Sequence, residues 1–264
     1  MRRLLNYPGS KWRLSSKIVE LMPEHRTYLE PFFGSGAILF AKEPSAIETV
    51  NDLDDNIVNL FSCIRKDPDR LIKDIVLTPY SRQAYEEALG KMYDFLNKDD
   101  DTSDSFERAK CFLICCSMGY GFRTSNRKCG WKSDISGRES AYALRNWVKL
   151  PKAVEQVAVR LKSVQIEHQD AFELMKRYDN PKVLMYLDPP YCLDTRNGTN
   201  YRYEFSEENH VRLLEFCATS KANIILSGYE NDLYREYLHD WNKYEFPDVS
   251  QAGTKRVECI WCNY

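Results

Sequence analysis

Hydrophobic and polar positions follow two patterns along the chain, and the first of them occupies its N-terminal fifth. There, short apolar runs alternate with stretches of helical spacing. This spacing predicts helices at residues 15–22, 37–42 and 56–65 and strands at residues 28–31 and 47–51. A glycine-containing turn follows the first of these strands. Strands and helices in this order favour a Rossmann-like parallel sheet.

The middle of the chain has the second pattern. Residues 68–161 read mainly as helices, with the clearest periodicity at 81–97, 106–117 and 139–147. From residue 164 the strand–helix pattern returns, with strands expected at 164–168, 183–187, 223–227 and 257–264, and helices at 171–178, 207–220 and 232–238. We therefore predict an α/β fold in which residues 1–66 and 162–264 form one sheet domain, interrupted by a mainly helical insert at residues 67–161.

The composition is that of an ordinary globular chain, with 43% hydrophobic residues, 29% charged residues and a formal net charge of −2. Any basic surface for a nucleic acid must therefore be local. The nine cysteines are scattered, and the pair Cys259 and Cys262 has no second pair at zinc-finger spacing. We expect reduced structural thiols and no metal site. Because the chain shows no signal peptide and no apolar run of roughly 18 residues, we expect it in a reducing cytoplasm and outside membranes.

The tetrapeptide Asp-Pro-Pro-Tyr at positions 188–191 is the sharpest chemical signal. It follows the apolar run at 183–187, and open α/β sheets place their active sites at the carboxyl ends of such strands. The Asp188 carboxylate and the Pro189 carbonyl can each accept one hydrogen of an exocyclic amine. Tyr191 supplies a ring on which a flat base can stack. The alternative interpretation is a strand-ending Pro-Pro turn with an incidental aspartate.

The turn after the first strand contains three candidate ligand-binding residues, Phe33, Gly34 and Gly36. Glycines here let the backbone approach a ligand closely. A full G-x-G-x-x-G and a Walker lysine are both missing, which favours an adenosyl ligand without phosphates. Asp52 follows the second strand, where an acid commonly accepts ribose hydroxyls. Its alternative role is to cap the helix that follows.

Two further candidates carry a weaker signal. Asp170 follows the strand at 164–168 and can accept a hydrogen bond from an adenine, with Phe172 packing nearby, although N-capping of the next helix explains Asp170 almost as well. Lys11 stands beside a glycine turn and can reach a carboxylate of a ligand. Read alone, that segment is only a turn with a surface lysine.

The predicted insert concentrates positive charge. Positions 119–149 contain seven basic and two acidic residues, a net charge of +5, and aromatic residues are interleaved with them. Such a segment suits contacts to phosphates and base edges, and a solvated polar face is the alternative. The candidate DNA-binding residues are Arg123, Asn126, Arg127, Lys128, Lys132 and Arg138.

Taken in order, these segments resemble the Dam-type (D12 class) DNA adenine-N6 methyltransferases, in which a glycine motif precedes an inserted recognition domain and Asp-Pro-Pro-Tyr follows it. The resemblance covers the chain from Tyr7 to Tyr264. The matching segments are Tyr7-Pro8-Gly9-Ser10-Lys11, Glu30-Pro31-Phe32-Phe33-Gly34-Ser35-Gly36, Asn51-Asp52, Asp170-Ala171-Phe172, Asp188-Pro189-Pro190-Tyr191, Phe205-Ser206-Glu207-Glu208-Asn209-His210 and Ser227-Gly228-Tyr229.

The resemblance implies an S-adenosylmethionine-dependent methyltransferase sheet that acts on N6 of an adenine in double-stranded DNA. By this resemblance, Tyr7, Lys11, Asp52 and Asp188 contact S-adenosylmethionine, while Asp188 and Tyr191 hold the flipped adenine. It leaves open a cognate restriction endonuclease as a partner, and we expect a monomer or weak dimer in a bacterial or phage-infected cell.

The sequence departs from this family in the insert. The Tyr-Asn and Phe-Asn-x-Pro pattern of GATC-specific members is replaced by the residues at 121–126 and 130–135, which leaves the target sequence open. Two alternatives are methylation of RNA by the same fold and a DNA-binding homologue without catalysis. The basic insert speaks against the first, and the intact glycine turn and Asp-Pro-Pro-Tyr speak against the second.

Overall fold

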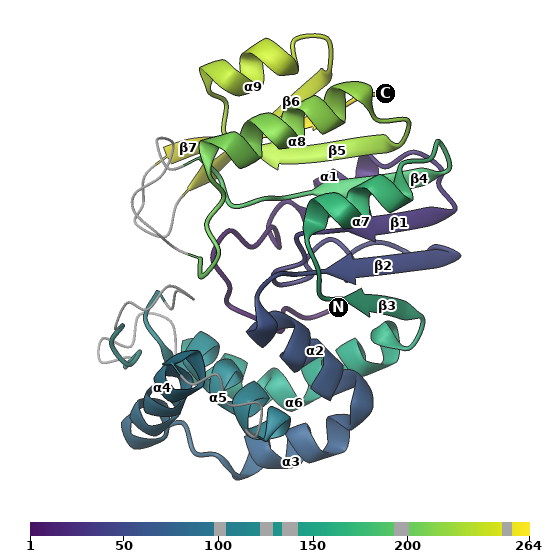
Figure 1. The fold of residues 1–264 in the computed structure, drawn as a ribbon. Helices are drawn as coiled ribbons and strands as arrows, with labels where there is room; N and C mark the ends of the chain where they lie inside the picture. The colour runs from purple at the N-terminus through teal and green to yellow at the C-terminus, as the bar shows by residue number, and fades with distance from the viewer. Residues whose placement is uncertain (98–103, 122–128, 134–141, 193–200, 250–254) are drawn as a thin grey trace. The chain divides into compact units, whose positions relative to one another are not determined.

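The computed structural model describes residues 1–97, 104–121, 129–133, 142–192, 201–249 and 255–264 (Figure 1). The chain divides into two compact units. The first contains Met1–Ser10 and Asp54–Lys162, and the second contains Lys11–Leu53 and Ser163–Tyr264.

The second unit is built on a seven-stranded sheet, counted over the described residues, with the order β3-β2-β1-β4-β5-β7-β6 (Figure 1). The strands are β1 (Thr27–Glu30), β2 (Ile47–Asn51), β3 (Val164–Glu167), β4 (Val183–Leu187), β5 (Asn223–Gly228), β6 (Asn242–Val249) and β7 (Lys255–Cys262). The first five in chain order are parallel, and β7 is antiparallel to β5 and β6. The predicted α/β fold is confirmed. Strand order reverses between β1 and β4, and open α/β sheets bind ligands at the carboxyl ends of strands at such a point.

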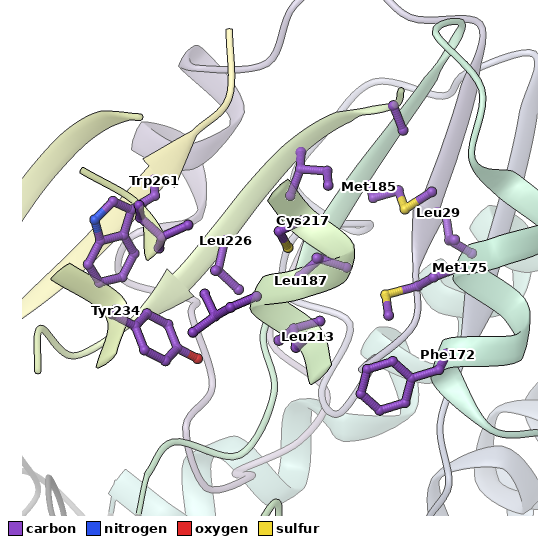
Figure 2. Packing of buried hydrophobic residues seen from close by; sticks show 14 of the residues in the cluster. Leu29, Phe172, Met175, Met185, Leu187, Leu213, Cys217, Leu226, Tyr234 and Trp261 are labelled. Atoms are coloured by element: carbon purple, nitrogen blue, oxygen red, sulfur yellow. The ribbon is translucent and has the colours of Figure 1, made fainter. Parts of the chain in front are cut away.

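One face of this sheet carries a large apolar cluster. The helices of this unit are α1 (Ser15–Glu20), α7 (Ala171–Tyr178), α8 (Glu207–Thr219) and α9 (Asp232–Tyr237). Figure 2 shows Met185 and Leu187 of β4 in one cluster with Met175 of α7 and Leu213 of α8. Alternate residues of a strand point to the same face, so β4 contributes every second side chain to this cluster. Each large apolar side chain buried in this way contributes roughly 1.5–3 kcal/mol of stability.

The intervening strand positions point to the opposite face, and several of them are polar. The buried polar side chains there are Tyr28 and Glu30 of β1, Tyr186 of β4, Ser227 of β5 and Glu258 of β7. The Tyr28 hydroxyl donates to Glu30 Oε2 at 2.8 Å, and the hydroxyl oxygens of Tyr186 and Ser227 lie 2.7 Å apart. Because a buried polar group without a partner is costly, these pairings allow polar side chains to be buried on this face beside apolar ones such as Leu184 and Ile225.

The described helices of the first unit are α2 (Asp55–Lys66), α3 (Pro68–Leu77), α4 (Arg82–Asn97), α5 (Ser105–Met118) and α6 (Tyr142–Leu161). Ten of the 14 residues of α5 are buried, as expected for a helix that is surrounded by others. Aspartates cap three of the helices: the side chains of Asp54, Asp67 and Asp104 accept backbone N–H groups at the starts of α2, α3 and α5.

Three elements differ from their sequence predictions. Residues 37–42 form turns where a helix was predicted. Their backbone N–H groups bond to carbonyls three or four residues earlier, without a regular repeat. Helix α6 continues through Pro151, well beyond the predicted end at residue 147, because a buried stripe runs on to Leu161. Strand β6 was not predicted. It contains Pro247 and lies at the sheet edge, where a proline is tolerated.

The boundary between the two parts of the chain also differs. The prediction placed it between residues 66 and 67, whereas the compact units meet between residues 53 and 54. Helix α2 packs against α5 and α6 and so belongs to the first unit. No helix among the described residues has the length and apolar character needed to cross a membrane.

A buried ion pair connects the turn after β1 with β2. Lys42 Nζ donates to Glu48 Oε1 at 2.6 Å, and also to the Glu43 carbonyl and Ser45 Oγ at 2.7 Å each. The side chains of Lys42 and Glu48 are 2% and 1% exposed. The three ammonium protons therefore have three acceptors, which compensates the burial of the charge.

Replacing Lys42 with methionine leaves the Glu48 carboxylate buried without its counterion. We expect Lys42→Met to lower the free energy of unfolding by about 3–5 kcal/mol, and Lys42→Met/Glu48→Leu to lose clearly less. Urea denaturation followed by tryptophan fluorescence measures both variants. A double variant that is as unstable as the sum of Lys42→Met and Glu48→Leu would contradict this account.

Candidate active site

Four parallel strands of the second unit end at one edge of the sheet. The glycine turn follows β1, Asp52 follows β2, Asp170 lies beyond β3, and Asp188 follows β4. Since the carboxyl ends of neighbouring parallel strands meet at the same edge, the predicted residues of this unit lie along one edge of the sheet.

Asn51 holds three of these strand ends together. Its Nδ2 donates to the carbonyls of Pro31 at 3.0 Å and Gln169 at 3.1 Å, and its Oδ1 accepts the Gln169 N–H at 2.9 Å. The Asn51 carbonyl accepts the Phe33 N–H at 2.9 Å. Only 1% of Asn51 is exposed. This one amide therefore fixes the loops after β1 and β3 on the end of β2.

The glycine turn is held by Asp52. The Gly34 N–H donates to Asp52 Oδ2 at 2.7 Å, and Gly34 and Gly36 have φ values of 49° and 66°, a region that favours glycine. A Cβ at Gly36 would lie 2.5 Å from the Phe40 ring and 2.6 Å from the Phe33 ring. The N-cap role considered for Asp52 is wrong, because Asp54 caps α2. Its proposed contact with a ribose stays a prediction.

Asp170 acts as a helix cap. Its Oδ1 accepts the N–H groups of Phe172 at 2.9 Å and Glu173 at 3.1 Å, which confirms the N-cap interpretation. Phe172 is 4% exposed and stacks on Phe205 at a centroid distance of 5.9 Å. The ring thus belongs mainly to the apolar core, and contacts of either residue with an adenine stay predictions.

A buried ion cluster surrounds Asp188. Lys11 Nζ lies 2.9 Å from Asp188 Oδ1 and 3.6 Å from Glu258 Oε1. The Tyr191 hydroxyl donates to the same Glu258 oxygen, and Lys11 Nζ lies 4.7 Å from the centroid of the Tyr191 ring. Tyr229 meets Tyr191 edge-on with ring centroids 4.8 Å apart. The first turn of this unit, β4 and β7 thus converge on one ammonium group.

Burial and charge act in opposite directions on these groups. Burial by itself lowers the pKa of Lys11, but the carboxylates of Asp188 and Glu258 outweigh it and hold that pKa above its usual value. Burial raises the pKa of Asp188, and the Lys11 ammonium limits that rise. Lys11 is 6% exposed, whereas the Asp188 side chain keeps 18% of its exposure. Lys11 is therefore not the surface lysine of a turn; it orients Asp188.

Glu258 is the site residue that sequence reasoning missed. It is 3% exposed, and the segment Val257-Glu258-Cys259-Ile260-Trp261 contains no other charge. A single carboxylate inside an apolar strand is unusual and was the available signal. Its partners could not be found from the sequence, because Lys11 lies near the other end of the chain and Tyr191 follows β4.

Glu30 adds a further buried carboxyl on the same face of the sheet. Burial, together with the nearby negative charge of Asp188, raises the pKa of Glu30 to about 8, although the Tyr28 hydroxyl and the Leu39 N–H donate to it. The group is therefore mainly protonated at neutral pH.

The remaining predicted residues lie in the first unit or outside the described residues. Tyr7 is 7% exposed and its carbonyl accepts the Ser10 N–H at 3.3 Å. Of the six candidate DNA-binding residues, only Lys132 is described; Arg123, Asn126, Arg127 and Lys128 fall in 122–128, and Arg138 falls in 134–141.

The segment around Lys132 is firmly held. Its N–H donates to the Met118 carbonyl at 2.7 Å, and its own carbonyl accepts the Tyr80 hydroxyl at 2.7 Å. Arg82 lies over the adjacent Trp131 ring, 5.0 Å from its centroid. The Lys132 side chain is half-buried, and burial lowers its pKa.

The hydrogen-bonding groups at the strand ends fit an adenosyl amino acid. Asp52 and Asp170 carry carboxylates, which accept hydrogen bonds from hydroxyl and amine groups. Among the described residues, the glycine turn after β1 contains no lysine or arginine that would bind a phosphate. The Gly34 N–H already binds Asp52. These features suit a nucleoside without phosphates better than a nucleotide.

Comparisons with known proteins bear on the family of this chain. Residues 7–252 match the family described as D12 class N6 adenine-specific DNA methyltransferase. The Type II methyltransferase M.MjaIII of Methanocaldococcus jannaschii is 26% identical over 269 residues, covering 92% of this chain and 89% of the relative. A DNA adenine methylase of Haemophilus influenzae is 24% identical over 270 residues, covering 97% and 91%. A solved rRNA methyltransferase, aviRa of Streptomyces viridochromogenes, aligns over 97% of this chain and 86% of that chain with 13% identity and a TM-score of 0.39.

Removal of the Asn51 amide takes its hydrogen bond from the buried Pro31 carbonyl and from the part-buried carbonyl and N–H of Gln169. We expect Asn51→Ala to lower the free energy of unfolding by roughly 2–4 kcal/mol. Asn180→Ala is the matched control, because Asn180 is exposed and its side-chain oxygen accepts the Lys182 N–H at 3.0 Å. Urea denaturation measures both variants. Equal losses in the two would show that Asn51 does not hold the strand ends.

Glu30→Gln removes a titration while keeping the shape of the side chain. Because the pKa of about 8 lies above the ordinary 4.5, the folded chain retains a proton that the unfolded chain loses. The stability of the wild-type protein therefore falls as pH rises between these values, by at most about 1.4 kcal/mol per pH unit.

The Glu30→Gln variant lacks this decline. Its free energy of unfolding, relative to that of wild type, should therefore increase from pH 5 to pH 8. Denaturation curves at several pH values test this, with Glu173→Gln on the exposed side of α7 as the control, since that side chain is 61% exposed. Parallel pH dependences of wild type and Glu30→Gln would contradict the raised pKa.

Proposed function

We propose a mechanism from the premise that this chain belongs to the D12 class of N6 adenine-specific DNA methyltransferases and methylates adenine in DNA at specific sites. The observation that supports it best is the position of Asp188. This carboxylate follows the buried strand β4, keeps partial exposure, and is fixed through one oxygen by a buried ammonium. A carboxylate held in this way is preorganised to accept a hydrogen bond from a substrate amine.

The family implies S-adenosylmethionine as the methyl donor, and its sulfonium supplies the methyl group that is transferred. We assign the ribose hydroxyls to Asp52 and the adenine to the region of Asp170 and Phe172. The backbone at Gly34 and Gly36 allows close approach of the nucleoside. Lys11, which binds Asp188 and Glu258, serves mainly to orient these carboxylates and adds its charge to the attraction of the cofactor's carboxylate.

The exocyclic amine of adenine is a poor nucleophile because its lone pair is delocalised into the ring. In our proposal, Asp188 and the Pro189 carbonyl each accept one amine hydrogen. Both contacts favour the pyramidal nitrogen of the transition state and aim its lone pair at the methyl group. The extra proton leaves N6 after transfer, so no strong base is required, and no covalent enzyme intermediate forms.

A base inside a duplex cannot reach this edge of the sheet, so the target adenine must leave the helix. We propose that it stacks on the Tyr191 ring, on the part that Lys11 does not cover. The basic insert would hold the DNA through phosphates, with Arg123, Asn126, Arg127, Lys128, Lys132 and Arg138 as candidates. Tyr80 and Arg82 hold the segment around Lys132 in place, so this part of the insert has a defined conformation.

Asp188→Asn keeps the size of the side chain and removes the charge. We expect methyl transfer to fall about 100- to 1,000-fold, as when one preorganised electrostatic contact to a transition state is lost. The experiment expresses wild type and variant in a methylation-deficient host and sequences the DNA with detection of modified bases.

Wild type should place N6-methyladenine in one short motif, and Asp188→Asn should leave that motif unmodified. Asp232→Asn is the control, because this aspartate lies at the start of α9 with 96% of its side chain exposed. Full modification by Asp188→Asn would remove Asp188 from the chemistry, and unmodified DNA from soluble wild type would contradict the proposed action on DNA.

A further inference from the structure

We propose that Glu258 is a positioning residue of this site: it accepts the single phenolic proton of Tyr191 and so keeps the Asp188 carboxylate available for the substrate amine. The inference rests on the proposed function, because it assigns Asp188 to the amine. It adds a residue from β7, which lies far from Asp-Pro-Pro-Tyr in the sequence.

The position of Glu258 is set by the antiparallel end of the sheet. Strand β7 pairs with β5 so that Cys259 lies opposite Gly228, and the preceding residue, Glu258, lies just beyond the carboxyl end of β5. Glu258 points away from the apolar cluster that contains Cys259. It is 3% exposed, and its Oε1 accepts the Tyr191 hydroxyl while lying 3.6 Å from Lys11 Nζ.

The Tyr191 hydroxyl has two possible acceptors. It donates to Glu258, and it also lies within hydrogen-bonding reach of Asp188. A phenol carries only one proton. If that proton pointed to Asp188, this carboxylate would bind Tyr191 as well as Lys11, and the incoming amine would meet a weaker and more crowded acceptor.

Charge explains why the proton goes to Glu258. The Lys11 ammonium is 2.9 Å from Asp188 but 3.6 Å from Glu258, so more of the negative charge of Asp188 is already compensated. Glu258 is also the more deeply buried carboxylate, at 4% side-chain exposure against 18%. A less compensated, less hydrated carboxylate is the stronger hydrogen-bond acceptor. The phenolic proton therefore stays on the side of Glu258.

Glu258→Gln tests this arrangement, because the amide has the same shape but is a weaker acceptor than the carboxylate. The phenolic proton should then move to Asp188. We expect kcat to fall about 10- to 100-fold, the effect of losing one charge-assisted hydrogen bond. The Kd for S-adenosylhomocysteine, measured by calorimetry, and the Tm should change little, because the Lys11–Asp188 pair persists.

The decisive variant is Glu258→Gln/Tyr191→Phe. Phenylalanine keeps the ring and removes the competing proton, so the double variant should regain the kcat of Tyr191→Phe alone and exceed that of Glu258→Gln. A residue with only a structural role would give additive losses instead. Glu245→Gln is the matched control on the neighbouring strand β6, where the side chain is 54% exposed, and its kcat should equal that of wild type.

The outcomes separate the two levels of the proposal. Wild type that transfers no methyl group to DNA would overturn the proposed function and this inference with it. An active wild type whose Glu258→Gln and Tyr191→Phe losses multiply, or whose Glu258→Gln loses cofactor binding and thermal stability together, would overturn the role of Glu258 alone.

Discussion

The site depends on one buried ammonium. Lys11 is 6% exposed, and a charge at that depth is tolerated only with close counterions. Its two carboxylates come from the end of β4 and from β7, so the pairing requires the first turn of this unit and both strands to be in place together. Removing either carboxylate would change the charge balance of the whole cluster. The same interaction that makes Lys11 tolerable in the interior therefore also fixes the orientation of Asp188.

The two faces of the sheet that carries the Lys11 cluster differ in the side chains they bury. Side chains such as Met185 and Leu226 bury apolar surface against α7 and α8, and this face supplies much of the stability of the unit. The other face carries Tyr28, Glu30 and Tyr186 in paired hydrogen bonds. Because strand side chains alternate with a period of two, one strand can contribute side chains to both faces. Strand β4 does so, and Asp188 follows its last residue.

Several candidate site residues could be proposed from the sequence because their signal is local. Asp188 follows five apolar residues, Asp52 follows a strand, and the glycine turn separates a strand from the next element. Local signals could not decide between neighbouring acids, however. Asp54 and not Asp52 caps α2, while Asp170 does cap α7. Which acid takes a cap depends on where the first helical turn forms, and in an acid-rich segment several choices have similar energies.

The sequence by itself determined the order of most strands and helices, the parallel sheet and the edge where the site lies, because hydrophobic periodicity and glycine or proline turns are encoded within a few residues. The tertiary structure alone decided that Lys11 is buried, that Glu258 joins the site, that Asn51 holds three strand ends and that α2 belongs to the first unit. Each of these depends on partners distant along the chain. Burial and charge compensation are properties of the packed chain, and no local pattern records which distant group will supply the counterion.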